Sequence, residues 1–148
     1  MTPAPTKANH LLLNGALVLV AEDEPFIALD VALAIEDAGG KVVGPAASVS
    51  EALALIEAEP IAGAILDVNL IDGDITPVAE AILRLGIPVI LQSGLSLPLE
   101  LAERFPDVII YSKPCASAKL VAQLAELIFN SDPAAQSILR ASNEDVRI

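Results

Sequence analysis

Five short apolar runs divide this chain, and each is followed by a longer segment in which apolar residues recur every three or four positions. The runs are Leu17–Ala21, Val42-Val43 within Lys41–Pro45, Ala64–Leu66, Val89–Leu91 and Val108–Ile110. An apolar run without alternating polar residues is typical of a strand that is covered on both faces, as in a parallel sheet. The pattern therefore predicts five buried strands.

The intervening segments carry the signals of amphipathic helices. Pro25 suits the first turn of a helix and Gly39-Gly40 its end, while Ser48 or Ser50 can cap the next helix. Three further helices are expected. The first begins at Thr76-Pro77, and we expect its inward-facing residues to be Val78, Ala81, Ile82 and Leu85. The second is short and covers Leu97–Phe105, and the third has an apolar stripe formed by Leu120, Leu124, Leu127 and Ile128.

Strands that alternate with helices predict right-handed crossovers and one doubly wound sheet. We therefore expect an α/β fold in which a five-stranded parallel sheet carries helices on both faces, in three α/β/α layers. A length of 148 residues suits one domain with a sizeable core. We expect this domain to cover residues 15–130, after a flexible leader at 1–14 and before a polar tail at 131–148.

Charge and composition narrow the classes of partner. The formal net charge is −12, with 8 Lys and Arg against 20 Asp and Glu, and no cluster of cations is present to bind nucleic acid. The same acidity argues against an anionic membrane surface, and no apolar run approaches the roughly 20 residues that span a bilayer. Cys115 is the only cysteine, which excludes a disulfide framework and fits a reducing compartment. We expect a cytoplasmic protein that binds neither nucleic acid nor membrane.

Polar residues of several kinds stand where the expected strands end. Strand one is followed by Glu22-Asp23, strand three ends in Asp67, strand four in Ser93 and strand five in Lys113. In open α/β sheets, ligands bind at the carboxyl ends of the strands. We therefore expect carboxylates, a hydroxyl and a lysine to meet at one edge of the sheet.

These residue types suit a divalent cation and a phosphoryl group. Two like charges about 4 Å apart repel by about 4 kcal/mol at an effective dielectric constant of about 20, so clustered carboxylates take up a proton or bind a cation. Asp23, Asp67 and the carbonyl of Asn69 can offer Mg²⁺ the oxygen ligands that it prefers. An aspartate can also form an acyl phosphate, whose oxygens would need the metal, Lys113 and Ser93 as partners.

The acidic pair, the aspartate after strand three, the strand-four hydroxyl and the Lys-Pro pair resemble the receiver domain of bacterial response regulators in their order and spacing. The resemblance covers about Leu17–Phe129. It implies a flavodoxin-like and CheY-like strand order, 2-1-3-4-5, and a phosphorylated Asp67. It also implies that Mg²⁺ or Mn²⁺ binds at Glu22, Asp23, Asp67 and the Asn69 carbonyl.

The same resemblance assigns further roles. Ser93 matches the switch hydroxyl of the family and Lys113 its lysine, with a cis bond before Pro114. The stretches VGPAASVSEALALI, LDVNL, PVAEAILRLGIPVI and SKP are similar to single-domain receivers of alphaproteobacterial stress and light pathways. This similarity implies a cognate histidine kinase of the HWE or HisKA_2 type and a downstream protein or phosphotransfer partner.

The function implied is that of a response regulator in a two-component phosphorelay. The domain would accept a phosphoryl group on Asp67 from a histidine kinase, and would then signal by protein–protein contacts or act as a phosphate sink. It would assist its own phosphorylation and dephosphorylation without being an enzyme that turns over a separate substrate.

Several positions depart from the pattern that the family shows at its switch. The end of strand four has Leu91–Leu95 where related receivers have Phe-Ala-Thr-Gly-Tyr, and Cys115 stands where a phenylalanine often follows Lys-Pro. The usual aromatic switch position holds Ile110. Tyr111 lies one residue later, and period-two alternation puts it on the opposite face of the sheet. These departures, with the apolar Leu95, bear on output and on the phosphate lifetime.

Two other functions share parts of this pattern. A pseudo-receiver would bind partners without phosphorylation, and the altered switch positions are compatible with that role. A Mg²⁺-dependent aspartyl phosphatase of the haloacid dehalogenase type would need an Asp-x-Asp motif after the first strand, where this chain has Glu22-Asp23-Glu24. We expect Glu24 to begin a helix, and Asp72 and Asp74 to belong to a polar loop beside the site.

Overall fold

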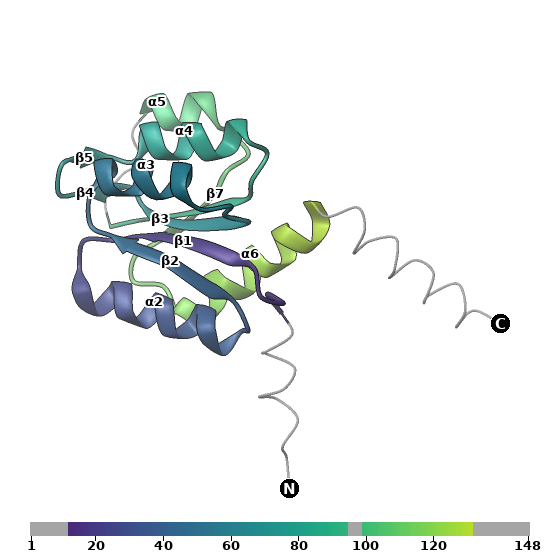
Figure 1. Ribbon diagram of the computed structural model, residues 1–148. Coiled ribbons are helices and arrows are strands. Elements are labelled where there is room, and N and C mark those ends of the chain that lie inside the picture. The colour runs from purple at the N-terminus through teal and green to yellow at the C-terminus, as the bar shows by residue number, and fades with distance from the viewer. Residues whose placement is uncertain (1–11, 95–98, 132–148) are drawn as a thin grey trace, which may run out of the picture.

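The computed structural model describes residues 12–94 and 99–131 (Figure 1). Most of the expected leader and tail, and Leu95, therefore lie outside the described residues. The first two residues of the expected fourth helix, Leu97 and Pro98, also fall outside them.

A five-stranded parallel sheet runs through the middle of the molecule in the order β2-β1-β3-β6-β7. This confirms the expected order 2-1-3-4-5. The strands are β1 (Leu17–Ala21), β2 (Lys41–Ala46), β3 (Gly63–Asp67), β6 (Val89–Ser93) and β7 (Ile109–Ser112). All five residues of β3 are buried, as expected for the central strand of a covered parallel sheet.

Helices cover both faces of this sheet. Figure 1 shows α2 and α6 on one side and α3, α4 and α5 on the other, which is the three-layer arrangement. The helices are α2 (Pro25–Asp37), α3 (Val49–Ala58), α4 (Thr76–Arg84), α5 (Leu99–Arg104) and α6 (Ser117–Ser131). Of the two serines that could cap α3, Ser48 does so by accepting a hydrogen bond from the Glu51 N–H at 3.1 Å.

The two faces of the sheet belong to two buried clusters, because successive side chains of a strand point to opposite faces. Leu19, Leu66 and Leu91 pack on the side of α3, α4 and α5. Ile65 and Ile90 pack on the side of α2 and α6. The three inner strands β1, β3 and β6 are thus buried on both faces, which explains their continuous apolar runs. The expectation of five buried strands is wrong for the two edge strands, because β2 has only two buried residues and β7 has none.

Two local features differ from the sequence-based expectation. A short antiparallel pair, β4 (Asn69–Leu70) with β5 (Gly73–Asp74), follows β3 where a plain loop was expected. The prediction that Leu85 faces inward is wrong, because Leu85 follows the last residue of α4 and its side chain is 63% exposed.

The carboxyl end of β2 supports the residue that follows β1. The register of the two strands shifts between Leu19 and Ala21, and the Glu22 N–H donates to the Ala46 carbonyl at 2.8 Å. Gly44 makes this path possible, with φ of +99° and no room for a side chain. The geometry of β2 thus fixes where the chain carries Glu22 at the edge of the sheet.

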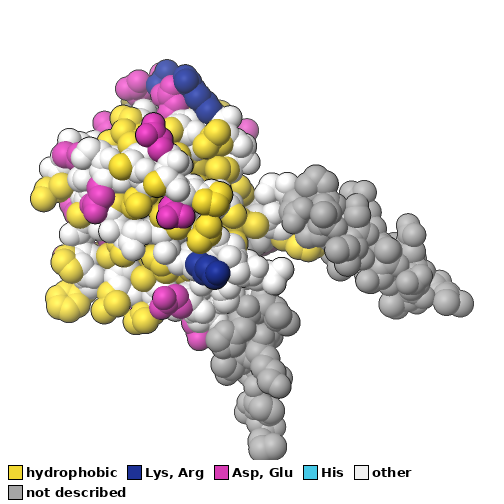
Figure 2. Space-filling model, viewed as in Figure 1, with side chains coloured by type: hydrophobic (Ala, Val, Ile, Leu, Met, Phe, Trp, Pro, Cys, Tyr) yellow, Lys and Arg dark blue, Asp and Glu magenta, His cyan; other side chains and the backbone are white. Residues whose placement is uncertain are grey.

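On the face shown in Figure 2, Lys and Arg side chains gather at the top, over α4 and α5, where Arg84 and Arg104 pair with Glu80. Within the described part of the chain, no helix is long and apolar enough to cross a membrane.

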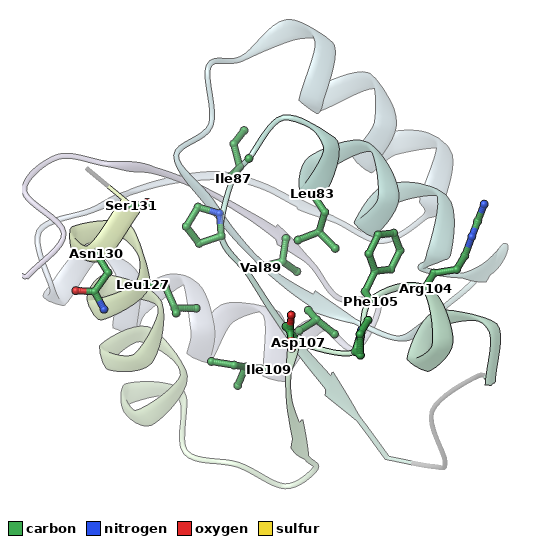
Figure 3. Close-up of a pocket in the computed structure, with 14 residues that line it drawn as sticks. Leu83, Ile87, Val89, Arg104, Phe105, Asp107, Ile109, Leu127, Asn130 and Ser131 are labelled. Carbon is green, nitrogen blue, oxygen red and sulfur yellow. The ribbon is translucent and has the colours of Figure 1, made fainter. Parts of the chain in front are cut away.

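An open cavity of about 560 Å³ lies at the amino ends of β6 and β7 (Figure 3). Its lining is largely apolar and includes Leu83, Val89, Phe105 and Leu127. The carboxyl ends of the same strands lie at the opposite edge of the sheet, so this cavity is remote from the candidate site.

Replacing Gly44 by alanine should destabilise the sheet beside Glu22. An added Cβ would lie 2.8 Å from the Ala46 nitrogen and 2.9 Å from the Val20 carbonyl oxygen, at a φ that side chains rarely adopt. We expect Gly44→Ala to lower the free energy of unfolding by about 3 kcal/mol in a urea titration.

Gly86→Ala is the matched control for this substitution. Gly86 also has a positive φ, +75°, but an added Cβ would meet nothing within 4 Å. The control should lose only about 1 kcal/mol. Equal losses in the two variants would contradict the close approach of backbone atoms at Gly44.

Candidate functional site

Two acidic residues leave β1 in different environments. Glu22 is buried, with 2% of its surface exposed, and its Oε2 accepts a hydrogen bond from the Glu24 N–H at 3.1 Å. Asp23 is exposed. Glu24 begins α2 as expected, since its side chain caps the helix by accepting from the Phe26 N–H at 3.2 Å.

Asp67 ends β3 beside this acidic pair, and 6% of its surface is exposed. Carboxylate oxygens of Glu22, Asp23 and Asp67 all lie within 4.8 Å of one another. Charges of the same sign at such separations repel strongly, so the three carboxylates together are a suitable place for a divalent cation.

Lys113 directly follows β7, and its side chain contacts two of these carboxylates. Its Nζ lies 2.8 Å from Glu22 Oε1 and 2.7 Å from Asp67 Oδ2. The Lys113 N–H also donates to the Ser93 carbonyl at 2.9 Å, which fixes the backbone of the lysine to the end of β6. The bond between Lys113 and Pro114 is cis, which confirms the expectation.

Burial and these contacts shift the pKa values of both partners. The pKa of Glu22 is raised, chiefly because burial penalises the charged carboxylate, while the hydrogen bond from Lys113 acts in the opposite direction. Burial alone would lower the pKa of Lys113, but the hydrogen bonds and charges of Asp67 and Glu22 outweigh it and raise that pKa. Lys113 therefore stays positively charged at neutral pH.

Asn69 and Ser93 lie at the same edge of the sheet. The Asn69 N–H donates to Asp67 Oδ1 at 3.3 Å, so the backbone two residues after Asp67 is hydrogen-bonded to its carboxylate. Ser93 is buried at the end of β6 and is paired with Ser112 of β7. Alternation along β6 places Ser93 on the face of Leu91, which packs on the side of α3, α4 and α5.

The family to which this chain belongs follows from its similarity to known proteins. No family model matches the chain. A CheY-like response regulator receiver domain protein from Methanospirillum hungatei JF-1 superposes with a TM-score of 0.70 at 25% identity, over 79% of this chain and 96% of that one. SdrG from Sphingomonas melonis Fr1 is 35% identical over 77% of this chain and 98% of its own, with a TM-score of 0.64. This chain belongs to the receiver domains of response regulators.

Relatives of this receiver include longer proteins. The regulator PhyR of Methylorubrum extorquens is 29% identical over 115 residues, which are 76% of this chain and 43% of PhyR. The response regulator PhyR from Brucella abortus is 26% identical, with a TM-score of 0.66 over 97% of this chain and 57% of that one. The receiver thus spans about half the length of these two relatives.

The loop after the candidate phosphoacceptor has a structural role that sequence reasoning did not assign. Asp72 was expected to belong to a polar loop beside the site, yet its Oδ1 accepts from the Val49 N–H at 2.6 Å and its Oδ2 from the Ser50 N–H at 3.2 Å. It therefore caps α3 from a distance, and Asp74 accepts from the Thr76 N–H at 2.8 Å at the start of α4.

Gln92 is a further site residue that the sequence analysis did not single out. It is the register partner of Asp67 and 2% of its surface is exposed. Its Nε2 lies 3.5 Å from Glu22 Oε1. The signal in the sequence was a long polar side chain directly after the apolar residues of β6.

Ile110 and Tyr111 lie on opposite faces of β7, as expected. Ile110 is 39% exposed. Tyr111 packs against the cluster on the side of α2 and α6, and its hydroxyl lies 3.4 Å from Gln123 of α6. Tyr111 therefore does not occupy the position of Ile110.

Asp72→Asn should destabilise the receiver in a pH-dependent way. The hydrogen bond from the Val49 N–H holds the pKa of Asp72 below its usual value. Its stabilising effect is therefore fully present above the pKa of the unfolded chain and is lost as the pH falls through the lower, folded pKa. We expect the variant to melt below the wild type at pH 7, with a difference that shrinks in acid. A difference that grows towards low pH would contradict the capping role.

Proposed function

We propose that this receiver accepts a phosphoryl group on Asp67 from the phosphohistidine of a sensor kinase, in a reaction that needs Mg²⁺ or Mn²⁺. The observation that carries the proposal is the position of the Asp67 carboxylate, 2.7 Å from Lys113 Nζ and within 4.8 Å of carboxylate oxygens of Glu22 and Asp23. Such a carboxylate has a cation at one side and a suitable place for a second cation at the other.

The metal would be held by Glu22, Asp23, Asp67 and the backbone carbonyl of Asn69. Three carboxylates close together exceed the charge that Lys113 balances, and oxygen is the ligand type that Mg²⁺ and Mn²⁺ prefer. When bound, the ion supplies positive charge to the oxygens of the transferring group.

Asp67 is the nucleophile of the proposed transfer. One carboxylate oxygen forms a bond to phosphorus while the P–N bond of the phosphohistidine breaks, and the electron pair returns to the imidazole. Lys113 Nζ already contacts Asp67 Oδ2 and would turn to a phosphoryl oxygen in the product. The Asn69 N–H keeps Asp67 Oδ1 oriented during the reaction.

Ser93 would donate its hydroxyl to another phosphoryl oxygen and so carry the signal towards the segment that follows β6. Its backbone carbonyl is joined to the Lys113 N–H, so the two proposed phosphoryl partners move on connected strands. Partner contacts, or service as a phosphate sink, would then be the output. Kinases of the HWE or HisKA_2 type are the proposed donors, in line with the resemblance to stress-pathway receivers.

Acetyl phosphate with Mg²⁺ should add one phosphoryl group to the wild-type protein, detected by intact-mass spectrometry. Asp67→Asn should show no such addition, because the nucleophilic oxygen is lost. Asp107→Asn is the matched control, since Asp107 is an exposed aspartate at the opposite edge of the sheet and should be modified like the wild type.

Three results would count against phosphorylation of Asp67. An unmodified wild type would favour a phosphorylation-independent binding module, and equal modification of Asp67→Asn would place the phosphoryl group elsewhere. Steady turnover of a generic phosphate ester would favour a phosphatase.

Mg²⁺ should raise the melting temperature of the unphosphorylated protein, because it binds the folded state alone. Asp23→Asn should lose most of this rise. In a chelator the same variant should melt no lower than the wild type, since one of three repelling carboxylates has been neutralised. Asp107→Asn should respond to Mg²⁺ as the wild type does. An equal rise in all three proteins would argue against a cation at the carboxylate cluster.

A further inference from the structure

A glutamine is buried in the sheet where its strand is otherwise apolar. Gln92 is 2% exposed, and the three residues before it, Val89, Ile90 and Leu91, are apolar and buried. Burying an amide costs free energy unless it is hydrogen-bonded, so an apolar side chain of the same size would suit this position better on packing grounds alone. A hydrogen-bonding role of the amide in the adjoining site would account for a glutamine at this position.

The side chain of Gln92 lies on the face of the sheet that holds the carboxylates. Asp67 of β3 and Tyr111 of β7 are its register partners on either side. Its Nε2 donates to Glu22 Oε1 at 3.5 Å, across the end of β3, the strand that lies between β6 and β1. Gln92 also lines the groove between α2 and the start of α6, together with Lys113 and Ser117.

Among the residues that the structure describes, three donors reach the Glu22 carboxylate. The Glu24 N–H reaches Oε2, while Lys113 Nζ and Gln92 Nε2 both reach Oε1. Lys113 is shared with Asp67, and in the proposed phosphorylated state it turns to a phosphoryl oxygen. The contact of Gln92 Nε2 with Glu22 involves neither Lys113 nor Asp67, so we expect it to persist after phosphorylation.

We propose that Gln92 is a positioning residue that keeps the Glu22 carboxylate oriented towards the divalent cation, independently of Lys113. This inference rests on the proposed function, because it concerns the same metal site.

Gln92→Met tests this role, since methionine keeps the length of the side chain and removes the donor. The contact is at the long end of the hydrogen-bond range, so we expect Mg²⁺ to bind the unphosphorylated variant about threefold more weakly, measured by calorimetric titration. Gln123→Met is the matched control, because Gln123 contacts the Tyr111 hydroxyl and no carboxylate of the site. It should bind Mg²⁺ like the wild type.

A double-mutant cycle separates positioning from a general loss of structure. In a Glu22→Met background, the further change Gln92→Met should alter Mg²⁺ affinity by less than about 1.5-fold, because both side-chain oxygens that Gln92 could orient are gone. A merely structural role predicts the same threefold loss in both backgrounds, and that result would overturn the inference.

A second measurement needs neither metal nor phosphate. The side-chain amide signals of Gln92, assigned in an ¹⁵N spectrum by their loss in Gln92→Met, should shift in Glu22→Gln and stay in place in Asp107→Asn. If the amide signals of Gln92 do not shift in Glu22→Gln, the contact between Gln92 and Glu22 is overturned.

The outcomes distinguish this inference from the function on which it rests. A wild type that binds Mg²⁺ but is not phosphorylated would overturn the proposed function and leave the role of Gln92 standing. Equal Mg²⁺ affinities of the wild type and Gln92→Met would overturn the role of Gln92 alone. A wild type that binds no Mg²⁺ would overturn both.

Discussion

The ammonium group of Lys113 holds the edge of this sheet together, because it contacts two carboxylates that would otherwise repel each other. It lies 2.8 Å from Glu22 Oε1 and 2.7 Å from Asp67 Oδ2. Both carboxylates are nearly inaccessible to water, and burying a charged group costs free energy unless it is paired, so the contact with Lys113 stabilises them there. With Asp23 beside them, the negative charge exceeds that of the lysine, and this imbalance is what a second, divalent cation would relieve.

The rest of the fold serves to bring these groups to one place. The order β2-β1-β3-β6-β7 puts β3 in the centre, so that Asp67 emerges between Glu22 on one side and Lys113 on the other. Side chains from both helical layers pack against the two faces of the sheet. A parallel sheet suits this purpose because all its strands end at the same edge.

Hydrogen bonds join the candidate site to a neighbouring helix and join the ends of two strands to each other. Asp72 ties the loop after Asp67 to the start of α3, and the Lys113 N–H ties the end of β7 to Ser93. A change in the charge carried by Asp67 would therefore act on backbone segments that belong to different strands. On β7, Ile110 is exposed, and Tyr111 packs on the side of α2 and α6 with its hydroxyl near Gln123.

The sequence by itself determined the alternation of strands and helices and the acidic, hydroxyl and lysine residues at the strand ends, because apolar runs and helical spacing are local signals. Only the tertiary structure decided that Lys113 is shared between two carboxylates, that Gln92 reaches Glu22 and that Asp72 caps α3. These contacts join residues that are 46, 70 and 23 positions apart. They depend on register, rotamer and loop path, which are set by the packing of the whole domain.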